Sequence, residues 1–282
     1  MSNKNVHSFI YVRQFSFKIL PKIVKFCYPH YLNYSQFINL HKNIFMKAGK
    51  VWKYPIKAAV FDVDGTILDS IKNYYQANKI MSGDPNFPFS LQQKLNRFSG
   101  KDVAKEVIKQ YHLKMTPEEY LQKRLRILSK LLPSSSLIPG IERIVRTIHD
   151  MGIPMAIGTS AWSCNHKSKI CKLQKFFSLF TVTICGDEVR EVKPSPEIFQ
   201  VAASKLGDFS PENVLVFEDA ANGIKAANSA GMPCILLSDG SSALMDDLYE
   251  YDCQPTLIIK NYSEFSFDSF TWEPPNQKKQ QK

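Results

Sequence analysis

The 282-residue sequence has no acidic side chain before residue 62, and this absence separates a leader from the rest of the chain. The first 61 residues hold ten of the 36 basic residues and none of the 26 acidic ones, so the remainder carries 26 basic against 26 acidic residues. The pI of about 9.2 therefore comes from the leader. A basic pI of this origin does not indicate that the rest of the chain binds nucleic acid.

The sequence also lacks a long hydrophobic run. No stretch approaches the ~20 apolar residues of a membrane span, and no compact apolar region with a small-residue cleavage site marks a secretory signal. The basic segment 1–54 suits an organellar transit peptide, although it has only one Arg beside eight Lys. It also suits a surface-binding arm, or a mis-called start upstream of Met46. The expected compartment is the cytoplasm, or the mitochondrion if the leader is a transit peptide.

Cysteine pairs with metal-ligand spacing are missing as well. No Cys-x-x-Cys occurs, and no His cluster accompanies the six cysteines. We expect reduced, mostly buried thiols in an intracellular protein, with Cys185 and Cys234 packed inside strands. The six are Cys27, Cys164, Cys171, Cys185, Cys234 and Cys253.

The most informative positive feature is the run FDVDGT at 61–66, which follows the apolar stretch 58–60. Asp62 and Asp64 would project from the carboxyl end of a buried strand, where open α/β sheets bind ligands. Neighbouring carboxylates repel each other unless a cation or a shared proton relieves them. Oxygen ligands favour Mg²⁺, which points to phosphate chemistry. Taken alone, the run is also compatible with a strand and a simple Asp-Gly turn.

Strand-like and helix-like segments alternate after residue 55. This alternation predicts an α/β fold, a Rossmann-like parallel sheet with crossover helices. The expected strands are 56–61, 153–158, 182–185, 213–217 and 233–237, and the expected helices are about 163–175, 196–206 and 220–230.

A helical block, 71–132, interrupts this alternation after the first strand. Thr116 and Glu119 form a capping box around Pro117. One helical face follows, with Leu121, Leu125, Leu128 and Leu132. We expect an all-helical cap at 71–136, joined to a core at 55–70 and 137–265 by linkers near 69–72 and 134–139, with a polar tail at 266–282.

Three further motifs lie at plausible positions. Thr159 follows an apolar run, Lys193 precedes two prolines, and the pair Glu218 and Asp219 ends the apolar run 214–217. With the run 61–66, these motifs resemble in order and type the four motifs of the haloacid dehalogenase (HAD) superfamily of phosphohydrolases. The resemblance covers about residues 56–260 and implies the HAD fold, a parallel α/β core with a small helical cap.

The resemblance also implies roles for individual residues. Asp62 would be the nucleophile and form an aspartyl phosphate, and Asp64 would be the general acid and base. Dehalogenases of the superfamily lack the second aspartate, so the chain resembles a phosphate-ester enzyme. Phosphate contacts would come from Thr159, Ser160 and Lys193, and Mg²⁺ would be held by Asp62, the backbone carbonyl of Asp64, Glu218 and Asp219.

The cap is expected to supply substrate contacts. Gly100 and Lys101 lie where relatives place a specificity loop, although an ordinary helix-to-helix turn explains the same residues. Within the superfamily, the segments 138–140, 176–180 and 216–223 resemble the pseudouridine-5′-phosphatase subfamily most. These segments would not contact a nucleobase, so they show kinship rather than specificity.

The expected function is a Mg²⁺-dependent phosphomonoester phosphatase acting on a nucleotide or sugar phosphate such as pseudouridine 5′-phosphate. A sugar-phosphate phosphomutase and a non-catalytic binding protein with the same fold remain alternatives. The expected partner is a small phosphate ester, with no nucleic acid, no membrane span and a monomeric state.

Overall fold

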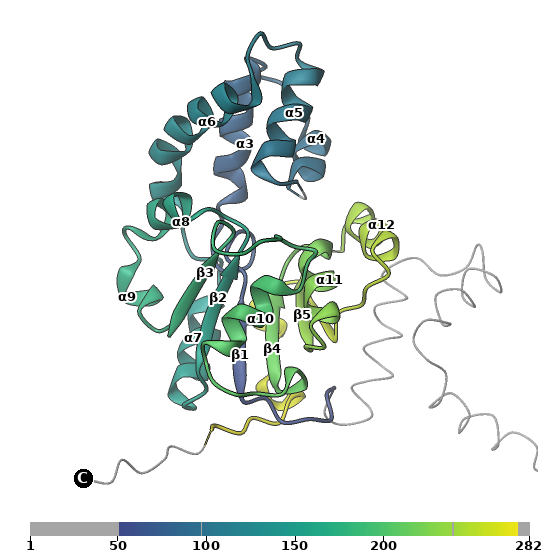
Figure 1. The fold of residues 1–282 in the computed structure, drawn as a ribbon. Helices are drawn as coiled ribbons and strands as arrows, with labels where there is room; N and C mark the ends of the chain where they lie inside the picture. Colours follow the sequence, from purple (N-terminus) through teal and green to yellow (C-terminus); the bar gives the residue numbers. More distant parts are fainter. Residues whose placement is uncertain (1–50, 97, 239, 276–282) are drawn as a thin grey trace, which may run out of the picture. The chain divides into compact units, whose positions relative to one another are not determined.

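The computed structural model describes residues 51–96, 98–238 and 240–275 (Figure 1). Of the predicted leader, 1–54, residues 1–50 lie outside the described residues, and so does Cys27. Three of the five described cysteines are buried (Cys185, Cys234 and Cys253), two are exposed (Cys164 and Cys171), and all five are free thiols.

Six parallel strands form one sheet, which confirms the predicted α/β class (Figure 1). The order is β3-β2-β1-β4-β5-β6. The sequence prediction missed only the three-residue edge strand β6. The strands are β1 (Ala58–Phe61), β2 (Met155–Thr159), β3 (Val182–Cys185), β4 (Val214–Glu218), β5 (Cys234–Leu237) and β6 (Leu257–Ile259).

The strand order places a switch point at the end of β1. The chain passes from β1 to β2 and β3 on one side of it, then crosses to β4 on the other. Phe61 is in register with both Ile157 of β2 and Phe217 of β4. Ligands bind at the carboxyl ends of strands where the order reverses. Asp62 follows β1 directly at this point.

Alternate residues of the strands face two helical layers. Phe61 belongs to the apolar cluster that includes α7 (Ile141–Asp150), and its ring stacks on Phe217 at 4.3 Å. Val60 faces the opposite cluster, which includes α10 (Glu197–Ser204) and α11 (Ala221–Ser229). A strand covered on both faces is apolar throughout, which explains the uninterrupted apolar runs in the sequence.

Four α-helices lie between β1 and α7 (Figure 1). Their side chains build apolar clusters of their own. The helices are α3 (Ile71–Ser82), α4 (Phe89–Leu95), α5 (Gly100–Gln110) and α6 (Pro117–Leu131). The Thr116–Glu119 capping box is present at the start of α6. The predicted face of α6 is only partly packed: Leu128 is buried, whereas Leu125 is 40% exposed and lines a cavity.

The two connections to these helices run beside each other. The backbone N–H of Asp69 donates to the carbonyl of Ser136 at 2.9 Å, and that of Ile138 donates to the carbonyl of Ile67 at 2.9 Å. These bonds tie the segment after the run 61–66 to the segment before α7.

Two helical segments differ from the sequence prediction. The helix expected at 163–175 is divided into α8 (Ser163–Ile170) and α9 (Gln174–Phe177), because a turn lets the Phe176 and Phe177 rings pack together against the sheet. The helix α12 (Ser242–Glu250) was not predicted.

The first part of the predicted polar tail is packed rather than free. Phe270 is buried, and Trp272 pairs with Ile56 beside β1. The N–H of Val51 donates to the carbonyl of Ser269 at 2.9 Å. The tail boundary at 266 is therefore wrong, because aromatic side chains through Trp272 complete the apolar layer.

Candidate active site

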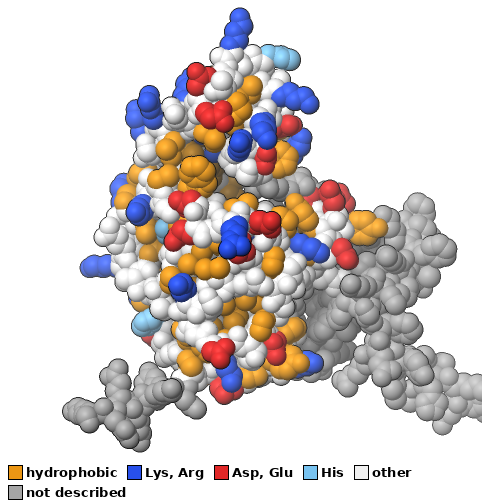
Figure 2. Space-filling model, viewed as in Figure 1, with side chains coloured by type: hydrophobic (Ala, Val, Ile, Leu, Met, Phe, Trp, Pro, Cys, Tyr) orange, Lys and Arg blue, Asp and Glu red, His pale blue; other side chains and the backbone are white. Residues whose placement is uncertain are grey.

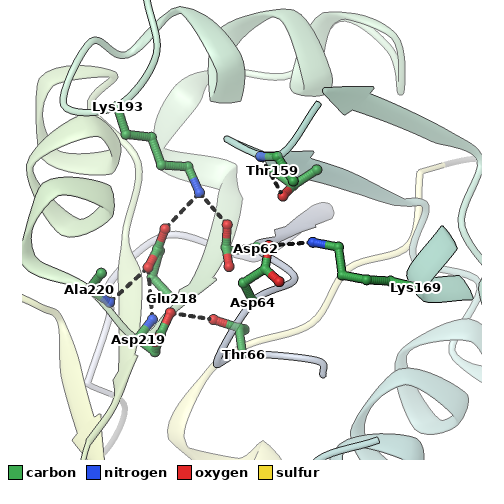
Figure 3. A network of polar contacts seen from close by, with 10 residues as sticks. Asp62, Asp64, Thr66, Thr159, Lys169, Lys193, Glu218, Asp219 and Ala220 are labelled. Atoms are coloured by element: carbon green, nitrogen blue, oxygen red, sulfur yellow. Dashed lines mark hydrogen bonds and ion pairs between the residues drawn. The ribbon is translucent and has the colours of Figure 1, made fainter. Parts of the chain in front are cut away.

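Lys193 is the centre of a buried ionic network at the switch point (Figure 3). Its Nζ lies 2.6 Å from Oδ1 of Asp62 and 2.7 Å from Oε1 of Glu218, and its side chain is 3% exposed. These contacts join the loop before α10 to the ends of β1 and β4. A buried lysine of this kind is stabilised only by such carboxylate partners.

The network holds more negative charge than Lys193 can balance. Burial, with repulsion from Glu218 and Asp64, raises the pKa of Asp62 to about 7 against the opposing attraction of Lys193. Burial, with repulsion from Glu218 and Asp62, raises the pKa of Asp219 well above its ordinary value. A cation between these groups would favour their charged forms.

Three carboxylates are close enough to hold one metal ion. Oxygens of Asp62, Glu218 and Asp219 all lie within 4.8 Å of one another. Oε2 of Glu218 already accepts from the backbone N–H groups of Asp219 and Ala220 at 2.8 and 2.9 Å, and Oε1 faces Lys193. Oδ1 of Asp219 accepts from Thr66 at 3.2 Å, which leaves Oδ2 available. Asp62 and Asp219 therefore fit direct Mg²⁺ ligation, and Glu218 fits ligation through water.

A second group with possible metal-ligating atoms is engaged differently. Cys185, Asp187 and Glu188 have such atoms within 4.8 Å. However, Asp187 accepts from the N–H and hydroxyl of Ser163 at 2.9 Å, and Glu188 accepts from the N–H of Cys185 at 2.7 Å. These bonds brace the turn after β3 against the start of α8.

Gly223 in α11 leaves room for the Glu218 carboxylate. A Cβ at this position would overlap that carboxyl group and lie 2.7 Å from its Cγ. We expect Gly223→Ala to lower stability by about 1–3 kcal/mol and to lower activity, because Glu218 must turn away from Lys193. Chemical unfolding and phosphate release measure the two effects.

Ser229→Ala, at the exposed end of the same helix, is the matched control and should change neither quantity. Wild-type activity and stability in Gly223→Ala would show that Glu218 does not need this space.

Asp64 is held by two side chains that the sequence analysis missed. Ser70 Oγ donates to Oδ1 of Asp64. Lys169 Nζ pairs with Oδ2 (Figure 3). The Lys169 side chain is completely buried, on α8. Burial alone would lower the pKa of Lys169, but attraction to Asp64 raises it overall. No sequence motif includes Lys169, and a single lysine in a short helix is ordinarily interpreted as a surface residue.

His166, one turn before Lys169, is buried with neither ring nitrogen bonded to any described residue. Burial first, then repulsion from Lys169, lowers its pKa to about 4. Unfolding restores an ordinary value near 6.5, so the unfolded chain binds the extra proton between these pH values. We expect the free energy of unfolding to fall as the pH drops from 6.5 to 4, by at most about 1.4 kcal/mol per pH unit from this group.

Urea unfolding at several pH values tests this expectation. His166→Leu should show a flatter dependence between pH 6.5 and 4, whereas the exposed His149→Gln should keep the wild-type slope. An unchanged slope in His166→Leu would contradict the assignment of a buried neutral imidazole.

The carboxylates of the site and Lys193 face a cavity of about 360 Å³ between the helical cap and the sheet. This volume lies in the usual range of small-molecule sites. Most of the sequence-predicted site residues line it: Asp62, Asp64, Gly100, Thr159, Ser160, Lys193, Glu218 and Asp219. Lys101, the second residue of α5, does not line it and is exposed. The structure gives no support to Lys101 as a substrate contact.

Thr159 lies at the carboxyl end of β2 with its side chain fully buried. Its Oγ1 accepts from the N–H of Ala161 at 3.2 Å. This bond orients the hydroxyl hydrogen away from that N–H, so it can be donated to a ligand oxygen. Behind the run 61–66, the Tyr262 hydroxyl donates to the carbonyl of Thr66 at 2.9 Å and fixes the loop.

A family model described as haloacid dehalogenase-like hydrolase matches residues 59–237. The chain belongs to this family. The family resemblance of the four motifs is therefore confirmed, and so is the prediction of a hydrolase.

Curated relatives of this HAD-family chain are named phosphatases. It is 34% identical over 218 residues to a probable pseudouridine-5′-phosphatase of Drosophila melanogaster, covering 75% of this chain and 92% of that one. It is 33% identical over 192 residues to the (DL)-glycerol-3-phosphatase 1, mitochondrial, of Arabidopsis thaliana, covering 65% and 64%. The second match thus spans less than two thirds of that relative.

Solved structures show the same fold. A β-phosphoglucomutase from Clostridium difficile superposes with a TM-score of 0.61 at 20% identity, covering 76% of this chain and 94% of that one. At this identity the likeness concerns the fold alone, and it matches the parallel sheet and helices of the HAD chain.

The remaining predictions concern the membrane, nucleic acid, the oligomeric state and the compartment. None of the helices within the described residues is both long and apolar enough for a membrane crossing. Acidic and basic side chains are interspersed over the described residues on the face in Figure 2. The monomeric state, the lack of nucleic-acid binding and the compartment stay predictions.

Proposed function

We propose that this HAD hydrolase is a Mg²⁺-dependent phosphomonoester phosphatase that acts through an aspartyl phosphate. The observation that carries the proposal is the position of Asp62, at the switch point of the sheet and bonded to Lys193. A carboxylate needs no base to become a nucleophile, and covalent capture divides one displacement into two easier steps.

The metal-binding residues fit this reaction. The oxygens of Asp62 and Asp219 supply the hard ligands that Mg²⁺ prefers. When bound, Mg²⁺ supplies positive charge that lets a phosphate dianion approach the carboxylates. Lys193 adds a second positive charge beside Asp62, and the Thr159 hydroxyl can donate to a phosphoryl oxygen.

Asp64 acts as the general acid and then the general base. It gives a proton to the leaving oxygen when Asp62 bonds to phosphorus, and it takes a proton from the water that then cleaves the aspartyl phosphate. Ser70 and Lys169 fix its two oxygens, so its carboxylate keeps one orientation through both steps.

The substrate we propose is a nucleotide or sugar phosphate such as pseudouridine 5′-phosphate. Tyr74, Phe98 and Trp162 line the cavity, and aromatic walls suit a sugar or base. The names of the relatives support the same range, since they include pseudouridine 5′-phosphate and glycerol 3-phosphate phosphatases.

Phosphate release from a panel of phosphomonoesters, with Mg²⁺ and with a chelator, tests the function. We expect Mg²⁺-dependent release, with pseudouridine 5′-phosphate among the best substrates. Broad selectivity would retain the phosphatase and remove the named substrate. A phosphomutase would use the same aspartates, and it would produce an isomerised sugar phosphate instead of free phosphate.

A further inference from the structure

The cap wall of the cavity contains a chain of directed hydrogen bonds that the proposed reaction does not use. Asn78 and Gln92 are almost fully buried, and both line the cavity together with Asn96 and Arg124. Arg124 Nε donates to Oδ1 of Asn78 at 3.2 Å. Nδ2 of Asn78 donates to Oε1 of Gln92 at 2.8 Å, and Nε2 of Gln92 donates to Oδ1 of Asn96 at 2.6 Å.

Arg124 fixes the direction of this chain. A guanidinium can only donate hydrogen bonds, so the Asn78 group facing it must be the amide oxygen. That choice turns the Asn78 amine toward Gln92 and, in the same way, the Gln92 amine toward Asn96. Every amide oxygen in the chain is therefore used as an acceptor, and the spare hydrogens are N–H donors.

Arg124 also has no carboxylate partner among the described residues. It also lies over the Tyr74 ring, whose centroid is 5.5 Å from the guanidinium carbon. Charged groups inside proteins are ordinarily paired, because removal from water is costly. A half-buried guanidinium that lines a ligand cavity has the chemistry of an anion-binding group.

We propose that this wall is a second ligand subsite that binds an anionic group, a carboxylate or a second phosphate, at a distance from the phosphate ester. This inference rests on the proposed function and extends its substrate class to sugar or nucleotide phosphates with a second anion, beyond singly anionic esters such as pseudouridine 5′-phosphate. Arg124 forms the charged contact, Asn78 holds the guanidinium in place, and Gln92 and Asn96 continue the chain and offer further N–H donors.

Two pairs of esters test the subsite, each pair differing in the second anion. Glucose 6-phosphate and 6-phosphogluconate differ by a carboxylate, and fructose 6-phosphate and fructose 1,6-bisphosphate differ by a phosphate. We expect kcat/KM to favour the doubly anionic member of at least one pair by about 10-fold to 100-fold. The pair with the larger ratio of kcat/KM values shows whether the subsite binds a carboxylate or a second phosphate.

Substitution of Arg124 should remove that preference. Arg124→Met keeps the length of the side chain and should lower kcat/KM far more for the doubly anionic ester than for its partner. Arg124→Lys keeps the charge, and should retain part of the preference even if Arg124→Met folds poorly. Arg126→Gln removes a charge from the exposed side of the same helix, and should leave the ratio unchanged.

A wild-type ratio near one in both pairs, or an equal loss for both members in Arg124→Met, would overturn the subsite. Calorimetric binding of the same esters to Asp62→Asn separates this result from a failure of the proposed function. Preferential binding without hydrolysis by the wild-type protein would refute the phosphatase and keep the subsite. Hydrolysis without preference would refute the subsite alone.

Discussion

Asp62→Asn is expected to abolish phosphate release, with a loss on the order of 10⁴-fold or more, because an amide cannot form the acyl phosphate. The amide keeps the size of the side chain. It can still accept from Lys193, which at present lies 2.6 Å from Oδ1. The loss would therefore report the missing nucleophile rather than a collapsed site. Single-turnover assays with a chromogenic phosphomonoester measure it.

The same substitution should leave the fold intact or stabilise it. Burial raises the pKa of Asp62 to about 7, which means that its charge is unfavourable in the metal-free protein. A neutral amide relieves repulsion from Glu218 and Asp64 while Lys193 keeps its bond to Glu218. Thermal unfolding without Mg²⁺ should give an equal or higher Tm. Substantial residual turnover with a normal Tm would contradict the nucleophile assignment.

Residues at strand ends could be predicted because their signals are local. Asp62 follows an apolar run, and Asp219 follows another, so residue type and strand position alone indicate the carboxyl edge of a parallel sheet. The topology then brings β1 and β4 side by side, with Phe61 opposite Phe217. The fold class was predictable for the same reason, since strands buried on both faces read as continuous apolar segments.

Residues on helices could not be predicted in this way, because their roles depend on which side of a helix faces the cavity. Lys169 and the exposed Lys167 lie on the same short helix and are indistinguishable as sequence. Arg124 and Arg126 pose the same problem on α6. In each case the tertiary packing of the helix decides which cation is buried. Lys101 shows the opposite outcome: it was predicted to contact the substrate because it follows Gly100, but the packing of the helix leaves it exposed.

Lys169→Met is expected to damage catalysis through Asp64. The methionine fills the space of the aliphatic stem and removes the ammonium that faces Oδ2. Ser70 would then be the remaining side-chain donor to that carboxylate among the described residues. An acid that protonates the leaving oxygen matters most for esters whose leaving group is a poor anion. A general acid contributes typically ~10²–10⁴-fold, and losing its orientation should remove much of that factor.

The dependence on leaving group distinguishes this role from a structural one. For an alkyl phosphate, kcat/KM should fall by about 10²-fold or more, whereas for p-nitrophenyl phosphate, whose leaving group is a stable anion, it should fall much less. Lys167→Met on the same helix is the matched control, and should leave both rates unchanged. Equal losses on both esters would mean that Lys169 supports the fold and not the acid.

A double substitution gives the sharper test. If Lys169 acts only by orienting Asp64, then Asp64→Asn already removes the benefit, and adding Lys169→Met should cost little more on the alkyl ester. Additive losses would instead assign Lys169 an effect of its own, such as attraction of the phosphate. Lys169 Nζ also lies 5.7 Å from the centroid of the Tyr74 ring on α3, so a cap residue contacts the same lysine that pairs with the proposed acid. A non-additive pair would therefore show that Lys169 acts through Asp64.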